Sequence, residues 1–138
     1  MNNIQVMLDK FLIEAEKLCD IKFAYLFGSY ARKENNKNSD IDIAIMPKYS
    51  LGKLEDTLLR GNLIEIGKSI FKRECDVVFL NIDAPVLKYE IIKDGIVIKD
   101  HEERISFESL SIREYFDYKY FIKYYDDQLL EDIRNMEV

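Results

Sequence analysis

The residues best suited to chemistry lie in one short stretch, where a Gly-Ser pair is followed, after ten residues, by two carboxylates. The pair is Gly28-Ser29, and the carboxylates are Asp40 and Asp42. Glycine leaves room for a phosphate to approach the backbone, and serine adds a hydroxyl. Two carboxylates side by side repel each other unless a cation lies between them, and Mg²⁺ prefers such hard oxygen ligands. The stretch therefore has the outline of a metal and phosphate site.

Two expected strands hold this stretch in place. The apolar run 21–27 predicts a buried strand that ends at Gly28, and a short helix over Tyr30–Glu34 would follow the turn. If a helix begins there, its first amides can point at an anion. The segment Lys33–Ser39 contains three Asn and no apolar side chain, so we expect a solvated connector.

The second strand, predicted over 41–46, determines where the carboxylates point. Side chains alternate between the two faces of a strand, so Asp40 and Asp42 share one face. Ile41 and Ile43 then point into the core.

Each of these parts is common by itself, but their ordered combination resembles the signature of the DNA polymerase beta-type nucleotidyltransferase superfamily. The runs 28–32 and 39–43 are similar to its minimal nucleotidyltransferase (MNT) branch, although Lys33 stands where many relatives have glycine. The resemblance implies an α/β (α+β) fold with a small mixed sheet flanked by helices and a C-terminal helical extension. It also implies that Gly28 and Ser29 bind the phosphates of ATP, and that Asp40 and Asp42 are catalytic and bind two Mg²⁺ ions.

A third carboxylate is expected at the start of the strand 74–80. From local sequence alone, Asp76 reads as an ordinary solvated acid at a strand end. In the superfamily that residues 28–42 resemble, a third acid arrives on a neighbouring strand after an intervening helix, and Asp76 has that place. The resemblance therefore implies that Asp76 is catalytic and a metal ligand, ahead of Glu74 and Asp83. Arg32 fits a phosphate contact and a solvent-facing position equally well.

The remaining pattern predicts helices that cover the sheet. Apolar residues recur at helical spacing over 6–18, 51–71, 86–93 and 105–136, and 96–98 is predicted as a further strand that could lie at the edge of the sheet. Asp83 is the expected cap of the third of these helices. The second helix should bury six apolar residues: Leu54, Leu58, Leu59, Leu63, Ile66 and Ile70. Its Gly67-Lys68 pair lacks the context of a phosphate loop.

Length, net charge and cysteine content limit the kinds of protein that this chain can be. The 138 residues suit one domain over 1–100 followed by a C-terminal helical element over 101–138, and the net charge of −6 argues against a nucleic-acid binder. An acidic chain suits a basic partner protein instead. No membrane-spanning stretch or leader is visible, Cys19 and Cys75 lack metal-ligand spacing, and His101 stands alone. We expect a cytoplasmic protein with reduced cysteines and a surface histidine.

The C-terminal helix holds seven aromatic residues between Tyr115 and Tyr125, which is more than a small sheet needs. They predict a partner interface, although about half of them could instead pack on the sheet. A lone acidic domain with such a tail resembles the MntA-type antitoxins of HEPN/MNT toxin-antitoxin pairs. That resemblance implies transfer of AMP from ATP to a tyrosine of a cognate HEPN toxin, a ribonuclease. The alternatives are an antitoxin that only covers its toxin, and a free-standing nucleotidyltransferase that modifies a small molecule such as an aminoglycoside.

Overall fold

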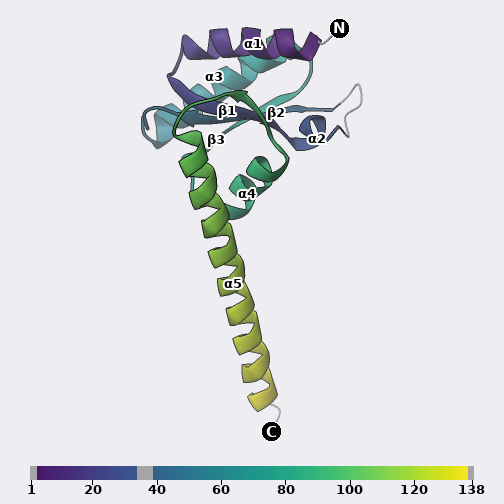
Figure 1. Cartoon of the computed structure of the whole chain (residues 1–138), viewed down its shortest axis with the longest axis vertical. Coiled ribbons are helices and arrows are strands. Elements are labelled where there is room, and N and C mark those ends of the chain that lie inside the picture. The colour runs from purple at the N-terminus through teal and green to yellow at the C-terminus, as the bar shows by residue number, and fades with distance from the viewer. Residues whose placement is uncertain (1–2, 34–38, 137–138) are drawn as a thin grey trace.

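The computed structural model describes residues 3–33 and 39–136 of the chain. Its elements form a four-stranded mixed sheet with the order β3-β2-β1-β4, flanked by helices (Figure 1). The strands are β1 Ile21–Phe27, β2 Ile41–Pro47, β3 Cys75–Phe79 and β4 Ile96–Lys99. The helices are α1 Asn3–Glu16, α2 Gly28–Ala31, α3 Lys53–Phe71, α4 Pro85–Asp94 and α5 Arg104–Met136. The predicted fold class, a small mixed sheet with flanking helices and a C-terminal helical extension, is confirmed.

The sheet topology joins the two halves of the sequence motif. β1 pairs antiparallel with β2 and with β4, whereas β2 pairs in parallel with β3 through the connection that contains α3. Asp42 is the register partner of Phe27 on one side and of Asp76 on the other. The end of β1 and the beginnings of β2 and β3 therefore meet at one edge of the sheet.

Helices cover both faces of this sheet. α1 and α3 lie on one face, where the core includes Phe11, Ile43 and Leu63, each 0% exposed. α4 and the beginning of α5 lie on the other face, where Phe107 packs against Phe23 with ring centroids 5.2 Å apart. Figure 1 shows the two layers, with α1 and α3 above the strands and α4 and α5 below them.

The buried face of α3 differs from the predicted one. Its buried residues are Leu59, Leu63, Gly67 and Phe71, which form a single row at intervals of four. Leu54 and Leu58 were expected in the core, but they are 70% and 61% exposed. Further along the helix, Gly67 lies directly against β3, where an added Cβ would be 2.3 Å from the Cys75 Sγ.

Three other helices have bounds that differ from the predicted ones. α1 spans Asn3–Glu16, and Val6 and Leu18, near the ends of the predicted helix, are 68% and 47% exposed. α2 begins directly at Gly28 and ends at Ala31. Arg32 and Lys33, which were predicted to be helical, form a turn after α2, and Lys33 has a φ of 61°. Residues 34–38, which hold the last predicted helical position and most of the connector, lie outside the described residues. α4 begins at Pro85 after Ala84 without a side-chain cap, so the prediction of Asp83 as its cap is wrong.

α5 extends far beyond the sheet. Its first turns pack on the body through Phe107 and Ser111, and Tyr115 stacks on Tyr89 with ring centroids 3.8 Å apart. From Phe116 to Met136 every residue is exposed, so most of the tail aromatics do not cover the sheet. Figure 1 shows this part of the helix projecting from the body. Across the described ranges, no helix has both the length and the apolar character needed to cross a membrane.

Replacing each of the two glycines of α3 with alanine should change the stability of the protein in opposite directions. Gly67→Ala should lower the free energy of unfolding by about 1–2 kcal/mol, because the new methyl group overlaps the buried Cys75 side chain. Gly61→Ala is the matched control: no atom lies within 4 Å of its added Cβ, and removing a helical glycine should stabilise the protein by up to about 1 kcal/mol. Urea denaturation of both variants checks this, and equal stabilisation by both would contradict the packing described here.

Candidate active site

Gly28 forms a turn that brings the backbone against a carboxylate. β1 ends at Phe27, and Gly28 has a φ of 76°, which L-residues rarely adopt. A Cβ at this position would lie 2.2 Å from the Asp42 Oδ2. Glycine is therefore required here for two reasons, the backbone angle and the close approach of Asp42. Ser29 follows in the first turn of α2 and is partly buried.

Asp42 and Asp76 lie directly opposite each other on neighbouring parallel strands. Paired residues of adjacent strands are separated by about 4.8 Å and point to the same face. Ile41, Ile43 and Val77 belong to the core beneath α1 and α3, so both carboxylates point to the opposite face. Both residues are partly buried.

The electrostatics of Asp42 reflect this proximity. Burial raises the pKa of Asp42, and the neighbouring charges of Asp76 and then Asp40 raise it further. Arg32 opposes these effects, so it lies near enough to act on the carboxylate. The predicted site residues Asp40, Asp42 and Asp76 are thus electrostatic neighbours in the structure.

Asp40 precedes β2 and is exposed. The backbone beside it is tied to α2 by Arg73, whose Nη1 donates to the Ser39 carbonyl oxygen at 3.2 Å. The same guanidinium lies 5.7 Å from the centre of the Tyr30 ring. Arg73 therefore holds the two described ends of the segment between Gly28 and Asp40 together.

Asp76 has a partner that sequence reasoning missed. Arg60 of α3 donates from Nη2 to the Asp76 Oδ1 at 2.7 Å, and from Nε to the Val77 carbonyl oxygen. The Val77 amide donates to the same Asp76 Oδ1 at 2.9 Å. Arg60 lies in the middle of a helix, sixteen positions before its partner, and only the packing of α3 on β3 brings the two together.

Neither the thiol of Cys75 nor the imidazole of His101, which follows β4 at the opposite end of β1 from Gly28, has the features of a metal ligand. Cys75 lies beneath the carboxylates, and burial, followed by the charges of Asp42 and Asp76, raises its pKa to about 12. A neutral buried thiol is a poor metal ligand. The predicted surface residue His101 is partly exposed and accepts a hydrogen bond on Nδ1 from the Glu103 amide at 3.0 Å.

The side chains fit a divalent cation by donor type and charge. Asp42 and Asp76 present oxygen ligands at one edge of the sheet, with Asp40 close to them, and burial together with the two neighbouring acids raises the pKa of Asp42. A closed cage is not preformed: within 3–33 and 39–136, no three His, Cys, Asp or Glu side chains are close enough to hold a metal ion. In this structure the Asp76 carboxylate is held by its ion pair with Arg60.

Comparisons with known proteins identify a family for this chain. The chain matches the family described as Polymerase beta, Nucleotidyltransferase over residues 9–104. Protein adenylyltransferase MntA of Shewanella oneidensis is 32% identical over 75 residues, which cover 54% of this chain and 51% of that protein. A putative protein adenylyltransferase of Methanocaldococcus jannaschii is 36% identical over 78 residues, which cover 55% of this chain and 77% of that protein. The chain spans about half the length of the first relative.

Solved structures share the fold. A chain of a toxin-antitoxin crystal structure with AMP-PNP has a TM-score of 0.75 and 23% identity, covering 94% of this chain and 99% of its own length. A chain from the complex of tri-AMPylated Shewanella oneidensis HEPN toxin with MNT antitoxin has a TM-score of 0.69 and 21% identity. It covers 91% of this chain and 98% of its own length. At these identities the similarity establishes the common architecture.

The contact between Gly28 and Asp42 predicts a coupled response to mutation. Gly28→Ala should destabilise the protein by about 1–2 kcal/mol, because alanine is strained at this φ and its Cβ displaces the Asp42 carboxylate. In an Asp42→Ala background the cost should fall by at least about 0.5 kcal/mol. A double-mutant cycle by chemical denaturation measures the difference, and strict additivity would show that the two residues do not touch.

The raised pKa of Asp42 predicts a pH-dependent stability. Ionising this carboxyl is harder in the folded protein than in the unfolded chain, so its contribution becomes unfavourable as pH rises through the folded pKa. Asp42→Asn should therefore raise the thermal midpoint of the metal-free protein at about pH 7, with the gain vanishing near pH 3, where the acid is neutral. The exposed carboxylate Asp127 provides the control Asp127→Asn. An Asp42→Asn gain that is independent of pH would contradict this account.

Proposed function

The chain belongs to the polymerase beta-type nucleotidyltransferase family, and we propose that it is an antitoxin that transfers AMP from ATP to a tyrosine hydroxyl of a cognate HEPN ribonuclease toxin. The observation that carries this proposal is the opposition of Asp42 and Asp76 across two strands, with Asp42 resting against the Gly28 turn. The adenylyltransferase relatives, and a structural neighbour in complex with an AMPylated toxin, support it.

The division of the chain is part of the proposal. Residues 1–100 would form the minimal nucleotidyltransferase domain, and residues 101–138 would form the partner-binding element. The family match ends at residue 104, where α5 begins. The exposure of α5 beyond Phe116 leaves this element free to meet another protein.

In the proposed reaction, the acids would hold the metal ions and the glycine-serine turn would bind the phosphates. Asp40 and Asp42 would hold two Mg²⁺ ions, and Asp76 would hold the one nearest the attacking oxygen. Magnesium, when bound, offsets the negative charge of the triphosphate and of the leaving pyrophosphate. Gly28 and Ser29 would grip the β and γ phosphates through the backbone and the hydroxyl, as the narrow turn allows. Arg32, which already acts on Asp42, would add positive charge near them.

The bond changes follow from nucleotidyl transfer. The tyrosine oxygen forms a bond to the α phosphorus of ATP, and the bond from that phosphorus to the bridging oxygen breaks, so pyrophosphate leaves. The phenolic proton passes to Asp76, which Arg60 and the Val77 amide hold through Oδ1. The carboxylate is thus oriented before the substrate arrives, which lowers the cost of reaching the reactive geometry.

A second candidate function is neutralisation by covering the toxin without chemistry. The exposed aromatic tail favours it, because Phe121 and Tyr125 are 55% and 54% exposed on the part of α5, from Phe116 to Met136, in which every residue is exposed. The two functions differ in whether the carboxylates are needed. A variant that lacks the charges of Asp40 and Asp42 but keeps the C-terminal tail unchanged separates the two functions.

Mass spectrometry of the toxin tests the catalytic proposal. Incubation with ATP, Mg²⁺ and the cognate HEPN toxin should add about 329 Da for each AMP transferred. Asp40→Asn with Asp42→Asn should slow transfer by at least about a hundredfold, since the charge that holds the cations is gone. Asp9→Asn, an exposed change on α1, is the matched control and should have no effect.

The alternatives give different results in the same assay. Neutralisation that survives in the double Asn variant, with the toxin mass unchanged, would replace the catalytic proposal with covering. ATP turnover that requires an aminoglycoside and no protein would point to a small-molecule nucleotidyltransferase.

A further inference from the structure

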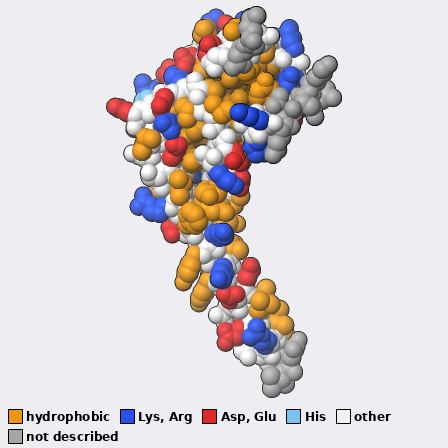
Figure 2. Space-filling view, turned by 45° about the vertical axis from the view of Figure 1, so that its right-hand side comes forward, with side chains coloured by type: hydrophobic (Ala, Val, Ile, Leu, Met, Phe, Trp, Pro, Cys, Tyr) orange, Lys and Arg blue, Asp and Glu red, His pale blue; other side chains and the backbone are white. Residues whose placement is uncertain are grey.

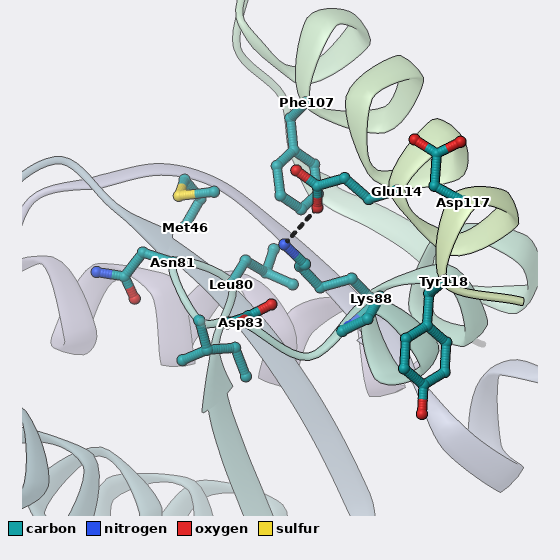
Figure 3. A pocket seen from close by; sticks show the side chains of 11 residues that line it. Met46, Leu80, Asn81, Asp83, Lys88, Phe107, Glu114, Asp117 and Tyr118 are labelled. Atoms are coloured by element: carbon teal, nitrogen blue, oxygen red, sulfur yellow. Dashed lines mark hydrogen bonds and ion pairs between the residues drawn. The ribbon is translucent and has the colours of Figure 1, made fainter. Parts of the chain in front are cut away.

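A cleft lies between α4 and α5, away from the candidate active site. It has a volume of about 590 Å³, and its apolar floor is formed by Met46, Leu80 and Phe107 (Figure 3). Met46 is four residues beyond Asp42 along β2, or about 13 Å at the rise of a strand. The cleft therefore opens on the same face of the sheet as the carboxylates, near the other end of β2.

The rim of this cleft is acidic. Lys88 is buried and 9% exposed, and its Nζ lies 3.3 Å from the Glu114 Oε2, so this cation is already paired. Figure 3 shows this pair, with Asp83 and Asp117 around it. Among the described residues, neither Asp83 nor Asp117 takes part in an ion pair. Two carboxylates above an apolar floor suit the aliphatic stem and charged head of a Lys or Arg side chain.

Tyr118 connects the cleft with the exposed part of α5. It lines this cleft and the adjoining cleft of about 700 Å³ beside Val86 and Glu90. Starting at Tyr118, one face of α5 carries an unbroken apolar row at helical spacing. Its members are Tyr118, Ile122, Tyr125, Leu129, Ile133 and Met136, which are 42% to 82% exposed. Figure 2 shows hydrophobic side chains gathered where α5 leaves the body and again along the helix.

The acidic charge of this surface favours a basic partner over a second copy of the chain. Between Asp117 and Met136, five acidic residues stand against three basic ones, and the whole chain has a net charge of −6. A second copy would therefore meet a surface of its own sign, whereas a basic partner would be attracted. A long apolar row on a helix packs best against another helix, whose ridges fit its grooves.

We propose that the cleft and the apolar row of α5 form one docking surface for an amphipathic helix of a basic partner protein, with a Lys or Arg side chain of that helix inserted between Asp83 and Asp117. The identification of this partner with a HEPN toxin rests on the proposed function. The surface itself is defined by the cleft, its unpaired acids and the continuous row.

Binding to the cognate HEPN toxin, measured by calorimetry without ATP, tests the surface separately from catalysis. Asp83→Asn with Asp117→Asn should weaken binding about tenfold at low salt, and the difference should shrink as salt screens the contact. Asp9→Asn with Glu65→Gln is the matched control, because it removes the same charge from α1 and α3 on the opposite side of the sheet. It should change the affinity less than about twofold.

The apolar row has its own pair of variants. Ile122→Glu should weaken binding at least tenfold, whereas Tyr120→Glu should leave it unchanged, because Tyr120 lies on another side of α5 and is 75% exposed. Both substitutions are on the exposed part of the helix, and circular dichroism verifies that each variant is folded.

The outcomes separate the docking proposal from the proposed function. Wild-type affinity in the Asp83/Asp117 variant overturns the docking surface even if AMP is transferred. Weakened binding in that variant, together with a toxin that the wild-type chain leaves unmodified in the presence of ATP, supports the surface and overturns the catalytic function. A dimer of the chain alone that Ile122→Glu dissociates would assign the row to a second copy and overturn the proposal.

Discussion

The parallel register between β2 and β3 is the constraint on which the candidate active site depends. It sets Asp42 opposite Asp76 and, because β2 also pairs with β1, it sets Asp42 beside the residue that precedes Gly28. A shift of one residue in β3 would turn Asp76 toward the core beneath α1 and α3. The buried row of α3 maintains this register, since Gly67 lets the helix rest directly on Cys75, the neighbour of Asp76.

Grouping the three acids beside the Gly28 turn lowers the stability of the folded protein, and two features of the structure show why. Asp42 has a raised pKa because it is partly buried beside two other acids, and Gly28 adopts a backbone angle that other residues avoid. Such features reduce stability and persist where binding or chemistry requires them. Arg60 offsets part of the cost by pairing with Asp76 from outside the acidic group.

Much of the fold could be predicted from the sequence because its signals are local. The alternation of Ile41, Asp42 and Ile43 predicts the strand and the direction of the carboxylate, and the turn at Gly28 follows from glycine alone. The buried face of α3 was only partly predicted, because Leu54 and Leu58 have the spacing of a core face that the sheet does not reach. The contacts of Arg60 and Arg73 could not be predicted, since each depends on how α3 and the strand after it pack. The roles of Asp40, Asp42 and Asp76 as metal ligands stay a prediction.

The length of α5 beyond the body has a mechanical consequence. The twenty residues from Asp117 to Met136 extend about 30 Å at the rise of an α-helix. A protein held along this arm is tethered, so its reactive segment would meet the carboxylate edge at the effective concentration of an intramolecular encounter. Little surface complementarity is then needed near the carboxylates themselves, and several acceptor positions within reach of the arm could be presented in turn.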